Sequence, residues 1–264
     1  MSGRLVYNQD FGQKIEKHVK YPIYKTDCFR FYRCLKFDQQ FYGVTVSALH
    51  AGNLRESDYR YSDIFEQKVS YWAADESVAM SEMKKNHCKG QGIGDYLMFW
   101  AYDDRSSTFP TRVNQDKLIV IDGVSIDGLQ PLLEKIDNKQ GLTCKDRQLI
   151  KDIMEAKPDC LMYESKAKKQ GVNYLFFESG FAKLSLREVS LHIGKGTNRR
   201  KGSIVCAYGN DYCPIVENYG KYFDKILKTK FDEAYLGTTE YRTRKAVFER
   251  SKEEKRKAYD NHEV

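Results

Sequence analysis

Apolar residues alternate with polar ones in several short segments along most of the chain. A period of two places every second side chain on the same face of an extended strand, so these segments predict strands with one buried face. Aromatic and β-branched residues, which favour strands, occupy many of these positions. The predicted strands span residues 29–37, 69–74, 95–102, 117–122, 160–164, 172–178 and 184–193.

Helical periodicity is found in fewer places and follows recognisable end signals. Asp75 is a suitable N-cap for a helix whose apolar positions include Val78 and Met83. Residues 128–156 predict a further helical region that is interrupted near 138–143. Strands mixed with helices in this way predict an α+β fold.

The other segments read as connections or as surface helices. Residues 43–65 are polar and turn-rich and predict a long loop with one short helical turn, and residues 195–203 predict a basic turn. Residues 219–234 carry apolar side chains at helical spacing, which predicts an amphipathic helix. Residues 240–260 are charged almost all round, which is typical of an exposed or partner-bound helix.

The composition supports a folded core and argues against several classes of protein. The chain is 41% hydrophobic and 13% aromatic, and it has no apolar run long enough for a signal peptide or a membrane span. We therefore expect a cytoplasmic protein with no membrane partner. The 7 cysteines are odd in number and form no C-x-x-C pair, which argues against a disulfide framework or a zinc ribbon, so we expect reduced thiols and no metal.

The net charge of +7 is concentrated near the C-terminus, where residues 195–264 hold 16 Lys and Arg against 11 Asp and Glu. One interpretation is a nucleic-acid-binding surface. The other is a solvated helical face, which the interspersed acidic residues favour. We treat residues 195–264 as a basic, mainly helical C-terminal extension of a domain formed by residues 1–194.

Four segments follow one another in the order of the motifs of a known family. The first contains Arg33 in the aromatic strand at 29–37, and the second is Arg60-Tyr61-Ser62. The third, VSYWAADESVAMSE, ends at Glu82, and the fourth joins PDCLMYES, ending at Ser165, to GVNYLFF at 171–177. Together they resemble the RES-domain toxins of bacterial toxin–antitoxin pairs. The Arg, Glu and Ser that name this family correspond to Arg33, Glu82 and Ser165.

This resemblance implies an ADP-ribosyltransferase-like split β-sheet with flanking helices, acting on NAD⁺ as substrate without a metal. Cleavage of the nicotinamide–ribose bond develops positive charge on the ribose, which the Glu82 carboxylate would stabilise. Arg33 or Arg60 would bind the pyrophosphate bidentately, and Tyr71 would offer its ring face to the cationic nicotinamide. Ser165 would orient the ribose or the carboxamide. The implied catalytic residues are Arg33, Tyr71, Glu82 and Ser165, and the implied cofactor-binding residues are Arg33, Arg60, Tyr61 and Tyr71.

The expected function is NAD⁺ cleavage by an intracellular toxin or defence effector. Hydrolysis, phosphorolysis and transfer of ADP-ribose to a macromolecular acceptor all stay open, because the acceptor depends on the shape of loops. An antitoxin protein and a second copy of the chain are the expected protein partners. Two other classes also stay open: a nucleic-acid-binding module that uses the basic C-terminal region, and an inactive ADP-ribosyltransferase-like scaffold.

The candidate residues also have ordinary structural interpretations. Glu82 could be an exposed helix residue, Arg33 one half of a structural ion pair, and Ser165 a turn residue at a strand end. His50 could mimic the first member of the His-Tyr-Glu triad that some ADP-ribosyltransferases use, although a loop histidine is usually solvated. Only the resemblance favours the catalytic interpretation of Ser165.

Overall fold

The computed structural model describes one large sheet with its helices and connections. The described residues are 14–15, 23–26, 30–38, 52–54, 61–88, 92–103, 118–194, 196, 199–206, 214–217, 242, 246, 250 and 253. The strands are β1 (Lys14–Ile15), β2 (Ile23–Thr26), β3 (Arg30–Lys36), β4 (Val69–Ala73), β5 (Tyr96–Asp103), β6 (Leu118–Asp122), β7 (Cys160–Glu164), β8 (Val172–Phe177), β9 (Leu184–Ile193), β10 (Arg200–Cys206) and β11 (Pro214–Glu217).

Among the described residues, the helices are fewer than the strands. They are α2 (Ser62–Phe65), α3 (Glu76–His87), α4 (Leu129–Asp137), α5 (Cys144–Glu155) and α6 (Glu178–Ala182), with a 3-10 turn, η3, at Gly123–Ser125. Within the described part of the chain, no helix combines the length and the apolar character needed to cross a membrane.

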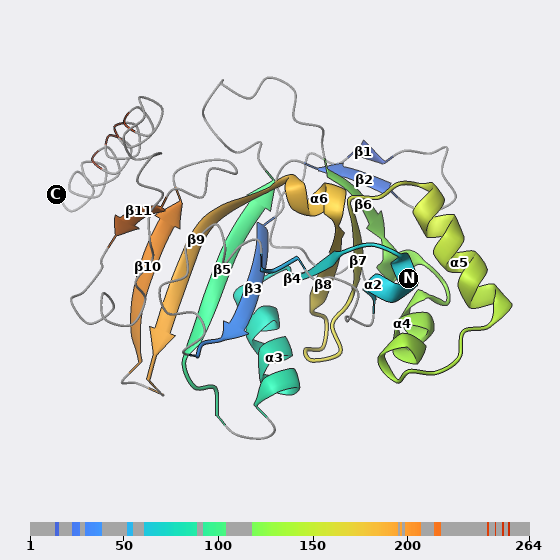
Figure 1. The fold of residues 1–264 in the computed structure, drawn as a ribbon, viewed down its shortest axis with the longest axis horizontal. Helices are drawn as coiled ribbons and strands as arrows, with labels where there is room; N and C mark the ends of the chain where they lie inside the picture. Colours follow the sequence, from blue (N-terminus) through green and yellow to red (C-terminus); the bar gives the residue numbers. More distant parts are fainter. Residues whose placement is uncertain are drawn as a thin grey trace.

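The strands form one 11-stranded mixed sheet in the order β1-β2-β6-β7-β8-β4-β3-β5-β9-β10-β11, which can be followed across Figure 1. β6 and β7 are parallel, and the other neighbouring strands are antiparallel. The α+β fold class predicted from the sequence is confirmed at this level.

The sheet is nearly divided between β3 and β4. Among the described residues only Tyr32 and Ala73 are paired there, whereas β3 pairs with β5 and β4 pairs with β8 along their whole lengths. Phe31 of β3 nevertheless contacts Tyr174 and Phe176 of β8, at ring-centroid distances of 5.0 and 4.7 Å, although β4 lies between these strands. The sheet therefore bends at this junction and encloses the side chains of one face.

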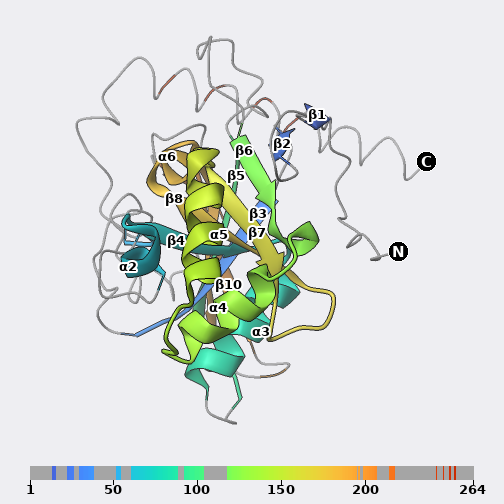
Figure 2. The same cartoon turned by 90° about the vertical axis from the view of Figure 1, so that its right-hand side faces the viewer.

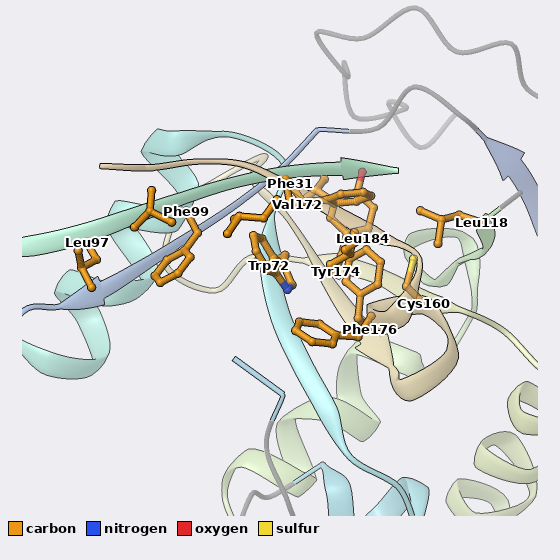
Figure 3. Packing of buried hydrophobic residues seen from close by; sticks show 14 of the residues in the cluster. Phe31, Trp72, Leu97, Phe99, Leu118, Cys160, Val172, Tyr174, Phe176 and Leu184 are labelled. Carbon is orange, nitrogen blue, oxygen red and sulfur yellow. The ribbon is translucent and has the colours of Figure 1, made fainter. Parts of the chain in front are cut away.

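We call the enclosed side chains the central cluster. Figure 3 shows side chains from both sides of the junction meeting in it, among them Phe31, Trp72, Leu97, Phe99 and Tyr174. All five are buried. Burial of this apolar surface is the main force that holds the two halves of the sheet together, because their backbones share so few hydrogen bonds.

Helices cover the opposite face, which we call the helical face. α3 packs through Val78, Ala79 and Met83 beside the junction, and α4 and α5 pack through residues such as Leu133 and Ile153 over β6, β7 and β8. Figure 1 shows these two groups of helices at separate places along the sheet, and in Figure 2, which looks from the right-hand side of Figure 1, α4 and α5 lie in the foreground. A candidate site on the helical face can therefore draw residues from both groups.

Capping residues fix where these helices begin. The Asp75 side chain accepts a hydrogen bond from the Val78 backbone at 2.9 Å, as predicted from the sequence. Thr143 and Asp146 form a reciprocal capping box at the start of α5. Lys135 Nζ lies 2.8 Å from Asp146 Oδ2, and this contact, with the Thr143 hydrogen bonds, lowers the pKa of Asp146 to about 2.

The predicted strands and helices within the described residues are present. The predicted helix after Asp75 is α3, and the interrupted helical region at 128–156 is the pair α4 and α5. The short strands β1 and β2 and the short helix α6 were not predicted. β10 begins at Arg200, inside the segment predicted as a basic turn, so that part of the prediction is wrong.

The expected C-terminal extension begins with strands. β10 pairs with β9, and β11 pairs with β10, so both continue the sheet beyond residue 194. Farther along, the described residues 242, 246, 250 and 253 are helical. The helix predicted at 219–234, and most of the segment 240–260, lie outside the described residues.

Candidate active site around Glu82

Glu82 lies on the flank of α3 that faces the connection between β7 and β8. Its Oε1 atom accepts a hydrogen bond from Ser165 Oγ at 2.6 Å and another from Asn173 Nδ2 at 2.7 Å. These partners are 83 and 91 positions away in the sequence. The fold thus brings Glu82 and Ser165, two of the four expected catalytic residues, into direct contact.

The loop of residues 165–171 holds Ser165 in place. Ser165 Oγ accepts hydrogen bonds from the backbone N–H groups of Ala167 and Lys168, at 3.1 and 3.2 Å. Since the oxygen already has these two donors, the hydroxyl hydrogen is directed to Glu82. Gly171 closes the loop, and a Cβ there would lie 2.9 Å from Val78 Cγ2. Glycine therefore lets the loop approach α3 closely.

Asn173 is a functional candidate that the sequence did not single out. It lies in β8, opposite Ala73 of β4 and Tyr163 of β7, and only 5% of its surface is exposed. A buried amide needs a hydrogen-bond partner, and Glu82 is that partner. The available signal was one polar residue in the otherwise apolar run VNYLFF, all of which is buried.

The two donors orient the Glu82 carboxylate but leave one of its oxygens available. Both bind Oε1, and no described residue makes a hydrogen bond or ion pair with Oε2. The side chain is half-buried. A carboxylate held in this way can accept a hydrogen bond from a ligand hydroxyl, or stabilise a positive charge that develops close to it.

No match came from comparing the chain with protein-family models, with curated proteins or with solved structures. The chemistry of the site is therefore deduced from its own side chains. Besides Glu82, these are the aromatic pair of Tyr61 and Tyr71, the guanidinium of Arg33 and the charged residues around the loop of residues 165–171.

Tyr71 lies on the helical face, as a diagonal neighbour of Asn173 in the pairing of β4 with β8. Its ring is half-buried and packs 5.6 Å from the ring of Tyr61, at an angle of 45°. Tyr61 itself is buried, with 2% of its surface exposed. Of these two expected cofactor-binding residues, Tyr71 can offer a ring face to a ligand, and Tyr61 supports it from behind.

Arg33 does not join the cluster around Glu82. Alternation along β3 places it with Phe31 on the face of the central cluster, opposite Phe99, and it is 8% exposed. Its guanidinium Nη1 donates a hydrogen bond to the Tyr71 backbone carbonyl at 2.7 Å. Arg33 thus bridges β3 and β4 close to the single residue pair that joins them, and it approaches the candidate site through the backbone of Tyr71.

Two other candidates from the sequence, Arg60 and His50, lie outside the described residues, so their places relative to Glu82 stay predictions. Among the residues that the structure describes, no group of three or more His, Cys, Asp or Glu side chains is arranged to hold a metal.

Charged side chains tie the loop of residues 165–171 to α3. Lys85 Nζ donates to the Lys166 carbonyl at 3.2 Å, and Lys168 Nζ lies 3.7 Å from Asp75 Oδ1 and also contacts Ser77. Burial would raise the pKa of Asp75, but hydrogen bonds from Ser77 and the backbone, with the charge of Lys168, bring that pKa below its usual value. Asp75 is therefore ionised and attracts the loop.

Proposed function

We propose that this chain cleaves NAD⁺ at the bond between nicotinamide and ribose, with Glu82 as the residue that stabilises the transition state. The observation that carries the proposal is the hydrogen bonding of one Glu82 oxygen to both Ser165 and Asn173. The Glu82 carboxylate is oriented and has its second oxygen available, and the partly buried Tyr71 is a diagonal neighbour of its partner Asn173. This arrangement suits a substrate that has ribose hydroxyls and a cationic aromatic ring.

The chemistry follows from the charges. When the C1′–N1 bond breaks, its electron pair goes to the pyridinium nitrogen, which leaves as neutral nicotinamide, and the ribose becomes an oxocarbenium ion. Glu82 stabilises this cation more strongly than it binds the uncharged ribose, and this difference lowers the barrier. Water, phosphate or a nucleophile on a macromolecule then bonds to C1′ and loses a proton.

The near-division of the sheet between β3 and β4 supports an ADP-ribosyltransferase-like split sheet. Arg33 and Arg60 are the proposed partners of the pyrophosphate. Since Arg33 is 8% exposed and lies on the face of the central cluster, this role requires the dinucleotide to reach through the junction to the face opposite Glu82. Cleavage of a cytoplasmic cofactor also fits the proposed toxin or defence role, with an antitoxin or a second copy of the chain as protein partner.

The test is release of nicotinamide from NAD⁺ by the purified chain. Glu82→Gln keeps the shape of the side chain but removes its charge, so we expect its rate at saturating NAD⁺ to fall on the order of a hundredfold or more. Glu76→Gln, an exposed position on the same helix, is the matched control and should keep the wild-type rate. Absence of both NAD⁺ cleavage and ADP-ribose transfer by the wild type would refute the proposal.

A further inference from the structure

Asp137, the last residue of α4, links two side chains that come from different parts of the fold. Its Oδ1 atom accepts a hydrogen bond from the Tyr61 hydroxyl at 2.6 Å, and its Oδ2 atom lies 2.9 Å from Lys166 Nζ. The side chain of Asp137 is 17% exposed, so water screens these contacts only in part. Tyr61 precedes α2, and Lys166 belongs to the loop of residues 165–171.

Each partner of Asp137 leads to the candidate active site by one further contact. The Tyr61 ring packs 5.6 Å from the ring of Tyr71. Lys166 follows Ser165, whose hydroxyl lies 2.6 Å from Glu82 Oε1. The carboxylate of Asp137 thus connects the residue behind the aromatic ring with the loop that orients the catalytic carboxylate. α4 lies in the region 125–156, which carries none of the motif residues, yet its last residue reaches both sides of the site.

We propose that Asp137 is a positioning residue for this site. It acts through Tyr61 and Lys166, and it keeps the Tyr71 ring and the Glu82 carboxylate in one fixed relative geometry. The inference rests on the proposed NAD⁺ cleavage. Its physical basis is that a carboxylate presents two acceptor oxygens at a fixed separation, whereas an amide presents one acceptor and one donor. Asp137→Asn can contact both groups only with Nδ2 donating to the Tyr61 hydroxyl oxygen and Oδ1 accepting from Lys166. This reverses the hydrogen bond to Tyr61 and removes the charge that attracts the Lys166 ammonium.

The experiment compares Asp137→Asn with Asp146→Asn. Asp146 makes a similar ion pair, with Lys135 at 2.8 Å, and caps the neighbouring helix, but none of its hydrogen bonds or ion pairs involves a residue of the site. We expect Asp137→Asn to lower kcat for nicotinamide release roughly ten- to a hundredfold, because small displacements of reacting groups have effects of this size. KM should change much less. Asp146→Asn should lower Tm at least as much as Asp137→Asn does, but it should leave kcat unchanged.

Two variants that each remove one contact of Asp137 show which contact is responsible for the loss in kcat. Lys166→Met removes the ion pair and Tyr61→Phe removes the hydroxyl, and each should reproduce part of the loss in kcat. When either is combined with Asp137→Asn, the losses should not add, because the same interaction is removed twice. Equal kcat for Asp137→Asn and wild type, or equal losses in Asp137→Asn and Asp146→Asn, would overturn the proposal.

A readout that is independent of NAD⁺ separates this proposal from the proposed function. The amide hydrogens of Ala167 and Lys168 bind Ser165 Oγ, so their exchange with solvent reports on the loop. Faster exchange in Asp137→Asn but not in Asp146→Asn supports the positioning role even if the wild type does not cleave NAD⁺. Unchanged exchange together with unchanged kcat refutes the positioning role alone.

Discussion

Substituting Asn173 by Asp tests the geometry of the site through its electrostatics. The change is nearly isosteric, but it replaces the Nδ2 donor, which lies 2.7 Å from Glu82 Oε1, with a second carboxylate oxygen. Two unit charges about 4 Å apart repel by about 4 kcal/mol at an effective dielectric constant of about 20. That energy corresponds to about three pKa units, so the two carboxylates should share one proton well above the pH at which either would normally lose it.

The sign of the pH effect follows from linkage. Both carboxyls are ionised in the unfolded chain above about pH 5, whereas the folded variant retains a proton. The contribution of this pair to stability is therefore present at low pH and is lost as the pH rises through the raised folded-state pKa. The catalytic rate of the variant should depart from that of the wild type over the pH range in which the carboxylate pair loses this proton. The assays are nicotinamide release and thermal unfolding between pH 5 and 9. Asn173→Ala, which loses the donor without adding charge, is the control and should lower the rate equally at every pH. Parallel pH profiles for Asn173→Asp and wild type would show that Asn173 and Glu82 are not neighbours in solution.

Two other substitutions test separate parts of the fold. Arg33→Lys keeps the charge but loses the planar guanidinium that binds the Tyr71 carbonyl, so we expect a lower Tm and weaker NAD⁺ binding; wild-type affinity in a binding titration would exclude the bidentate pyrophosphate role. Burial, with the nearby charge of Lys201, lowers the pKa of His192 from 6.5 to about 4, so its contribution to stability is complete above pH 6.5 and is lost as the pH falls toward 4. His192→Phe keeps a ring against Tyr96, and its Tm should fall less than that of the wild type between pH 6.5 and 4. Equal pH dependence of Tm in His192→Phe and in the wild type would contradict the lowered pKa of His192.

Local patterns in the sequence were sufficient to predict features that depend on residues within a single helix or strand. Asp75 predicted the start of α3 because an N-cap hydrogen bond involves residues only three positions apart. Only the family resemblance assigned Glu82 and Ser165 to one site, and their direct contact was not predicted. Nothing local relates a helix residue to a loop 83 positions later. The contacts of Asp137 with Tyr61 and Lys166 are of the same non-local kind.

Other features were missed because the local pattern was weak or ambiguous. β10 reads RKGSIVC, where basic residues and a glycine interrupt the alternation, and its partner β9 supplies the pairing that makes it a strand. The alternation of side chains along β3 implies that Arg33 lies on the sheet face opposite to that of Tyr32 and Cys34. The sequence does not show which of the two faces carries the candidate site, because that depends on where α3 packs.

The nearly divided sheet has a consequence for how the chain folds. The two halves, one built from β1, β2, β6, β7, β8 and β4 and the other from β3, β5, β9, β10 and β11, are not successive stretches of sequence. The chain passes from one half to the other at every connection from β2 to β6, and again between β8 and β9. The half that contains β4 is thus completed only after β3 and β5 of the other have been made, and the other half only after all of the first. Pairings between strands distant in sequence close slowly, so folding should proceed on the millisecond-to-second timescale of non-local β topologies.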